Sequence, residues 1–197
     1  MTGQEVNVAG LYLRSGGAGE TTYLLLHGLG ATGEVWDGLV DLIERNNAGC
    51  WLAPDFRGHG RSPWERPYTY GSLMDDLMPL VNEASRLVVV GHSMGGVIGL
   101  MLGGSLPNVE RVLGIGIKTS WNETELEQMQ ALSTRPVRWW PTRVEAIERY
   151  LKVSGLIGLV SPDSPTARCG VIAGDDGQYR LAADPAIYTV GRPPVAE

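Results

Sequence analysis

Two glycine-rich motifs in this chain have the residue types and the spacing for chemistry. Residues 91–96 read Gly-His-Ser-Met-Gly-Gly, and this GxSxG spacing is typical of a nucleophile elbow, a tight turn that presents a serine hydroxyl to a carbonyl carbon. Residues 28–33 read Gly-Leu-Gly-Ala-Thr-Gly, the GxGxxG spacing of a dinucleotide-binding turn, and Asp55 follows at the distance of an acid that binds ribose hydroxyls. The first motif predicts acyl transfer through Ser93, and the second predicts binding of a nicotinamide cofactor.

The residues around the two motifs favour the nucleophile elbow. An apolar, β-branched run over residues 87–90 precedes Gly91, and a glycine-rich predicted helix follows Ser93, which is the strand–turn–helix setting that an elbow needs. A plain tight turn of small residues is the alternative. In the other motif, Glu34 stands at the start of a predicted helix, where its carboxylate would repel the pyrophosphate. A nicotinamide-dependent oxidoreductase therefore stays a distant alternative.

The elements that must position these motifs alternate between strand and helix. Residues 22–26 carry no charge, as expected for a strand that is covered on both faces. Further strands are predicted over residues 6–9, 11–14, 50–53, 87–90 and 112–117. Helices are predicted over residues 34–46, 72–80 and 94–106. The helix over residues 72–80 opens with Ser72, whose capping-box partner is Asp75. This order predicts an α/β fold with a mostly parallel sheet and helices on both faces.

The uncharged run over residues 87–106 resembles a membrane-spanning helix in length and in its spaced glycines, Gly95, Gly99 and Gly103. The break at residues 91–93 divides this run into a strand, a turn and a helix. The glycines would then let the helix pack closely against the sheet. We expect no membrane segment here.

The pattern changes after residue 118. Two helices are predicted over residues 122–132 and 142–153, opened by capping boxes at Asn122 and Thr142, and no strand is predicted between them. Such a pair is typical of a helical lid inserted over the sheet. We therefore predict a core over residues 1–118, a lid over residues 119–160 and a loop-rich return segment over residues 161–197, without a clear final strand.

Composition restricts the partners. The chain of 197 residues has 22 acidic and 16 basic side chains and a net charge of −6, so a basic surface for nucleic acid is not expected. Its two cysteines, Cys50 and Cys169, predict neither a disulfide framework nor a metal site. The first ten residues lack the features of a secretory signal. These observations predict a cytoplasmic protein that binds a small molecule and no metal.

Three blocks in order resemble the α/β-hydrolase family, in its serine-nucleophile branch: His27-Gly28 after a strand, residues 55–62 (DFRGHGRS) after the next, and the elbow at residues 91–96. The resemblance implies that Ser93 is the nucleophile and that the backbone N–H groups of Leu29 and Met94 form the oxyanion hole. It implies a structural role for residues 55–62 and no cofactor. We expect a small apolar acyl substrate, an ester, a lactone or a related carbonyl compound, with Trp36, Trp121 and Trp139 as candidate substrate contacts.

The resemblance also implies partners for Ser93, because in this family an acid and then a histidine follow the serine along the chain. No histidine follows Ser93 in this sequence, and His27, His59 and His92 are better explained as loop residues. The last strands of the fold are also missing. We therefore expect the front part of a hydrolase: a truncated chain, one piece of a split protein, or a degenerate homologue that binds acyl ligands without turnover. The predicted strand from Val112 to Ile117 would be a sheet edge for self-association or for a complementing chain.

Overall fold

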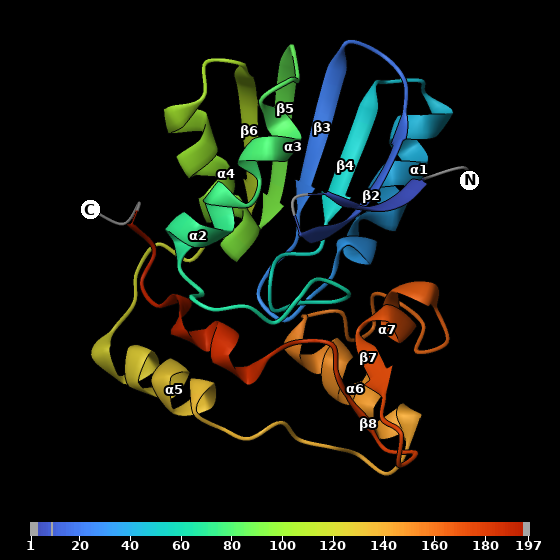
Figure 1. Ribbon diagram of the computed structural model, residues 1–197, viewed down its shortest axis with the longest axis vertical. Coiled ribbons are helices and arrows are strands. Elements are labelled where there is room, and N and C mark those ends of the chain that lie inside the picture. Colours follow the sequence, from blue (N-terminus) through green and yellow to red (C-terminus); the bar gives the residue numbers. More distant parts are fainter. Residues whose placement is uncertain (1–3, 9, 195–197) are drawn as a thin grey trace.

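A sheet of six strands forms the centre of the computed structural model, which describes residues 4–8 and 10–194 (Figure 1). The strands are β1 (Gln4–Val8), β2 (Leu11–Gly17), β3 (Thr21–Leu26), β4 (Cys50–Pro54), β5 (Arg86–His92) and β6 (Val109–Ile115), in the order β1-β2-β4-β3-β5-β6. Strands β4, β3, β5 and β6 run parallel, and β2 is antiparallel to both of its neighbours. The predicted α/β fold with a mostly parallel sheet is confirmed. Residue 9 of the first predicted strand lies outside the described residues.

Alternate residues of each central strand point into two different apolar layers. Leu24 and Leu26 of β3 pack with Val89 of β5 in the layer that holds helix α4 (Met94–Ser105). Leu25 and Val90 pack in the layer that holds the short helix η1 (Gly33–Trp36) and helix α1 (Asp37–Arg45). Helices thus cover both faces of the sheet, which explains why β3 has no charged residue.

Glycines let α4 lie against β5 and β6. A Cβ atom added at Gly99 would lie 3.0 Å from Val89 Cγ1, and one added at Gly103 would lie 2.9 Å from Val112 Cγ2. The residues that resembled a membrane span therefore form a strand, a turn and a closely packed helix. Within the described part of the chain, no helix combines the length and the apolar character needed to cross a bilayer.

Helix α2 (Tyr70–Asp75) begins earlier than the sequence predicts. Thr69, and not Ser72, is its N-cap: the Thr69 side chain accepts a hydrogen bond from the Ser72 N–H, and the Ser72 hydroxyl accepts one from the Thr69 N–H. The predicted capping box from Ser72 to Asp75 is therefore wrong by three residues. Pro79 divides the predicted helix, since α3 (Met78–Val81) is a separate turn with proline near its start.

Residues 119–194 form a layer beyond the carboxyl ends of the parallel strands, here named the C-terminal layer (Figure 1). Its helices α5 (Glu123–Ser133) and α6 (Arg143–Val153) open with capping boxes at Asn122 and Thr142, as predicted. The rest comprises α7 (Pro165–Cys169), the hairpin of β7 (Val171–Ala173) and β8 (Tyr179–Leu181), and η2 (Pro185–Val190). The predicted return segment therefore contains short regular elements, and its residues 195–197 lie outside the described residues.

Strand β6 is the edge of the sheet beside β5. It begins three residues before the predicted strand and ends at Ile115. On the face that carries α1, its side chains are poorly covered: Leu113 is 57% exposed and Ile115 is 44% exposed. In the part of the chain that the structure describes, no strand pairs with the outer side of β6.

Candidate active site

Ser93 occupies a strained turn between β5 and α4. Its backbone angles are φ 50° and ψ −115°, and Asn47 is the only other described non-glycine residue with a positive φ. Such a conformation costs on the order of 1–3 kcal/mol and persists only where the surrounding structure enforces it. Here the Ser93 N–H donates to the Ile115 carbonyl at 2.8 Å, and the Ser93 carbonyl accepts from the Gly96 N–H at 3.0 Å. The turn is thus fixed from both sides.

The glycines of the motif are required by close approach and not by unusual dihedral angles. A Cβ atom at Gly91 would overlap the Gly95 carbonyl. A Cβ atom at Gly95 would overlap the carbonyl oxygen of Leu26 and lie 2.6 Å from that of His27. The start of α4 therefore touches the end of β3, which brings the loop after β3 close to Ser93.

Among the described residues, one hydroxyl and two backbone donors near this turn and in the loop after β3 lack a hydrogen-bond partner. Ser93 is half-buried, and although it stands at the N-cap position its side chain does not cap α4. The N–H of Met94, in the first turn of α4, has no intrahelical acceptor. The Leu29 N–H, in the loop after β3, donates to no backbone acceptor in the described residues. Two free N–H groups that faced the oxygen of a reacting carbonyl group would stabilise the charge that develops on it during nucleophilic attack.

His27 is held as a neutral, structural side chain. The Phe56 N–H donates to its Nε2 at 3.0 Å, so its Nδ1 carries the proton and donates to the Gly28 carbonyl at 2.8 Å. Complete burial, together with nearby His59, lowers the pKa of His27 well below its ordinary value. Both ring nitrogens are therefore engaged with backbone, and His27 supports the loop that carries Leu29.

The other two histidines are not paired with Ser93 either. His59 is fully buried, its Nδ1 lies 3.1 Å from the Arg57 carbonyl, and burial lowers its pKa to about 4. His92 is half-buried, and its ring lies against Gly28 and Gly116. Burial lowers the pKa of His92 as well. None of these contacts positions an imidazole to accept the Ser93 proton.

Internal contacts occupy the acidic groups of the dinucleotide-like motif. Asp55 is buried, and its two carboxylate oxygens accept hydrogen bonds from the Gly33 N–H at 2.7 Å and the Arg61 N–H at 3.0 Å. Burial and the nearby Glu34 carboxylate raise the pKa of Asp55 to about 6. Glu34 is itself buried and pairs with Arg61 at 2.6 Å. The acid that would bind a ribose instead ties two loops together.

The three tryptophans predicted to contact substrate lie in three different environments. Trp36 packs in the layer of α1 and lines a cavity of about 310 Å³ with His92 and Ile115. Trp121 packs beside the core that contains Met94, with the Lys118 ammonium 4.6 Å from its ring centroid. Trp139 is 40% exposed and lies over the β7–β8 hairpin, where it would collide with a Cβ atom at Gly174. The structure does not bring the three indoles together.

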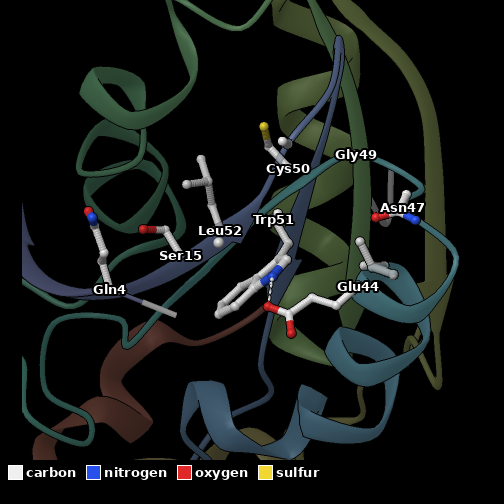
Figure 2. Close-up of a pocket in the computed structure, with 12 residues that line it drawn as sticks. Gln4, Ser15, Glu44, Asn47, Gly49, Cys50, Trp51 and Leu52 are labelled. Carbon is white, nitrogen blue, oxygen red and sulfur yellow. Dashed lines mark hydrogen bonds between the residues drawn. The ribbon is translucent and has the colours of Figure 1, made fainter. Parts of the chain in front are cut away.

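Two further cavities flank the molecule. One, of about 150 Å³, lies in the C-terminal layer beside Gly30 and is lined by Arg135, Arg138 and Arg149. The other cavity, of about 680 Å³, lies where β4 begins, at the end of the sheet opposite Ser93. Trp51 lines it (Figure 2), and the Trp51 Nε1–H donates a hydrogen bond to the Glu44 carboxylate at 3.0 Å. Among the described residues no cluster of histidine, cysteine and acidic side chains could hold a metal ion.

The sequence does not single out Arg135, Arg138 and Arg149, which line the cavity of about 150 Å³. The available signal is a local excess of positive charge, because residues 135–152 contain five basic side chains in a chain of net charge −6. Their convergence depends on how the segment between α5 and α6 folds back. Spacing along the chain does not reveal it.

Comparison with known proteins places this geometry in a family. The model of the "Alpha/beta hydrolase family" matches residues 23–195. The chain belongs to the α/β-hydrolase family. Lipase LipV of Mycobacterium tuberculosis is 34% identical over 97 residues, which cover 48% of this chain and 36% of the relative. Pimeloyl-[acyl-carrier protein] methyl ester esterase of Pectobacterium atrosepticum is 31% identical over 116 residues, 55% of this chain and 41% of the relative. The matches thus span less than half the length of these relatives.

Solved structures of the family share the fold. A thioesterase domain from the curacin biosynthetic pathway superposes with a TM-score of 0.78 at 22% identity, covering 98% of this chain and 75% of that structure. An esterase of M. tuberculosis gives a TM-score of 0.74 at 20% identity, covering 94% of this chain and 66% of that structure. The chain therefore shares the fold of these two structures and covers the larger part of each.

Proposed function

We propose that this chain supplies the nucleophile and the oxyanion hole of a serine hydrolase that acts on a carboxylic ester, a lactone or a related carbonyl compound. The observation that carries the proposal is the strained turn at Ser93, and it is supported by the N–H groups of Met94 and Leu29, for which the described residues provide no backbone acceptor. Each such donor contributes about 3 kcal/mol to stabilisation of the transition state. The lipase and the esterase that this chain resembles support the same class of reaction.

The proposed reaction proceeds through an acyl-enzyme. The Ser93 Oγ forms a bond to the carbonyl carbon, the carbonyl oxygen takes up negative charge at the two N–H groups, and the bond to the leaving group then breaks. The proton from Oγ passes to a base and from there to the leaving group, and water later releases the acid by the same route. The acyl chain of the substrate is small and apolar, and residues 119–160 act as the lid that covers it.

The base is the missing component. His27 and His59 are engaged with backbone, and no histidine follows Ser93. We infer that a polypeptide segment outside these 197 residues supplies the base and its acid, and that it docks at the edge strand β6. The exposed side chains of Leu113 and Ile115 support this docking site. An acyl-binding protein without turnover is the second candidate, and the same missing histidine favours it.

A fluorophosphonate probe tests the proposal, because it forms a covalent adduct only with an activated serine. With imidazole added to replace the missing base, we expect the adduct at Ser93, located by peptide mass spectrometry, and its loss in Ser93→Ala. The matched control is Ser105→Ala, at the exposed far end of α4, which should label like the parent chain. A folded chain that never labels would favour the acyl-binding protein.

A further inference from the structure

The small cavity of the C-terminal layer lies next to the proposed oxyanion loop. Gly30, which follows Leu29, forms part of its wall, and a Cβ atom at Gly30 would lie 3.8 Å from Val153 at the end of α6. The opposite walls come from the segment that joins α5 to α6 and from η2. A ligand in this cavity would therefore lie beside the loop that positions a reacting carbonyl group.

The charge in this cavity is strongly biased. Arg135, Arg138 and Arg149 line it, and none of the three forms an ion pair with any acid that the structure describes. Asp184 is the single acid in the wall among described residues, and both of its carboxylate oxygens are occupied, one by the Tyr68 hydroxyl at 2.7 Å and one by the Ala186 N–H at 2.9 Å. Three exposed arginines and one carboxylate thus line the cavity and give its wall an excess of positive charge, in a chain with a net charge of −6.

The remaining wall is apolar and aromatic. Leu132, Val137 and Ile187 contribute aliphatic surface, and the Trp140 ring has the Arg138 guanidinium 5.1 Å from its centroid. A guanidinium group over an aromatic ring can still form two parallel hydrogen bonds to a carboxylate or a phosphate. A volume of about 150 Å³ is benzene-sized and below the roughly 300–1,000 Å³ of sites that enclose a whole ligand. The cavity therefore fits one substituent of a larger molecule.

We propose that this cavity binds an anionic group, a carboxylate or a phosphate, at the far end of the substrate whose carbonyl group reacts at Ser93. The inference rests on the proposed function for the position of the carbonyl group. It defines the substrate class as an ester or thioester that carries a negative charge at the end of an apolar chain. The arginines would select against neutral acyl esters of the same length.

Calorimetric titration of Ser93→Ala, in which turnover cannot interfere, tests this inference. Monomethyl adipate and hexyl phosphate are the anionic probes, and dimethyl adipate is the neutral probe. We expect at least one anionic probe to bind tenfold or more tightly than dimethyl adipate. Arg149→Gln and, independently, Arg138→Gln should each weaken that probe about tenfold or more, as expected for loss of a charged hydrogen-bonding partner. The matched control is Lys152→Gln, which removes an exposed positive charge from the same helix outside the cavity and should change affinity less than twofold.

The outcomes separate this inference from the proposed function. Preference for one anion identifies the group that the cavity takes. Equal affinity for the charged and neutral probes, or anion binding that survives both arginine substitutions in folded protein, would overturn the inference while leaving the reactivity of Ser93 untouched. Selective anion binding by a chain whose serine does not react with fluorophosphonate even when imidazole is added would sustain the anion site and refute the hydrolase proposal.

Discussion

Substitution of Gly95 by alanine tests whether close packing forms the elbow. The new Cβ atom would overlap the Leu26 carbonyl oxygen and lie 2.6 Å from the His27 carbonyl oxygen. Both obstacles are backbone atoms that cannot rotate away, so the start of α4 must move away from β3. Overpacking of this kind costs typically 1–3 kcal/mol, and we expect about 3 kcal/mol because two strand-end carbonyls are hit at once. For a chain of this size the loss lowers the melting temperature by roughly 6–12 °C.

Gly104 of the same helix provides the matched control. A Cβ atom there would meet no atom within 4 Å, so Gly104→Ala should gain up to about 1 kcal/mol from helix propensity alone. Urea unfolding followed by circular dichroism measures both free energies of unfolding. A Gly95→Ala variant within about 0.5 kcal/mol of the parent chain would refute the packing argument for the elbow.

Three further predictions concern the supports of the site. Burial lowers the pKa of His59 to about 4 in the folded chain, against an ordinary 6.5, so the unfolded chain binds this proton first as the pH falls. The difference in free energy of unfolding between the parent chain and His59→Gln, measured by urea unfolding at each pH, should therefore shrink by about 2 kcal/mol between pH 7.5 and pH 5. Asp55, whose pKa is raised, acts in the opposite direction but equally in both proteins, and an unchanged difference would show that His59 does not titrate in this way. Arg61→Gln leaves the buried Glu34 carboxylate unpaired and should lower the free energy of unfolding by about 3 kcal/mol. Arg86→Gln, at the exposed pair with Glu110, should not change it measurably, and equal losses in the two variants would contradict this prediction. Leu113→Lys should shift the chain towards monomer in sedimentation, and a parent chain that is already monomeric at all concentrations would refute self-association through β6.

The parts of the fold that the sequence predicts are those set by local pattern. The charge-free run of β3 and the β-branched run of β5 indicate buried strands because both of their faces are covered. The capping boxes at Asn122 and Thr142 form because each needs only two side chains three residues apart. The box at Ser72 is a false prediction for the same reason: Thr69 offers the same local chemistry one turn earlier, and the pattern alone does not choose between them.

The parts that the sequence does not reveal depend on contacts between distant residues. The tautomer of His27 is set by the Phe56 N–H, 29 positions away along the chain. Trp139 and Trp140 are neighbours in sequence, yet Trp139 lies over the β7–β8 hairpin and Trp140 lines the small cavity of the C-terminal layer. The turn at Ser93 between β5 and α4 could thus be predicted from a motif, whereas the cavity lined by arginines could not.

The most direct test of the account is acylation of Ser93 when a base is added. Intact-protein mass spectrometry after treatment with p-nitrophenyl butyrate would measure one added butyryl group, with and without imidazole to replace the missing histidine, and peptide mapping would locate it. The account predicts a single adduct at Ser93 that forms faster with imidazole and is absent from Ser93→Ala. An adduct elsewhere in the chain, or equal acylation of the parent chain and Ser93→Ala, would contradict the claim that this turn presents a nucleophile.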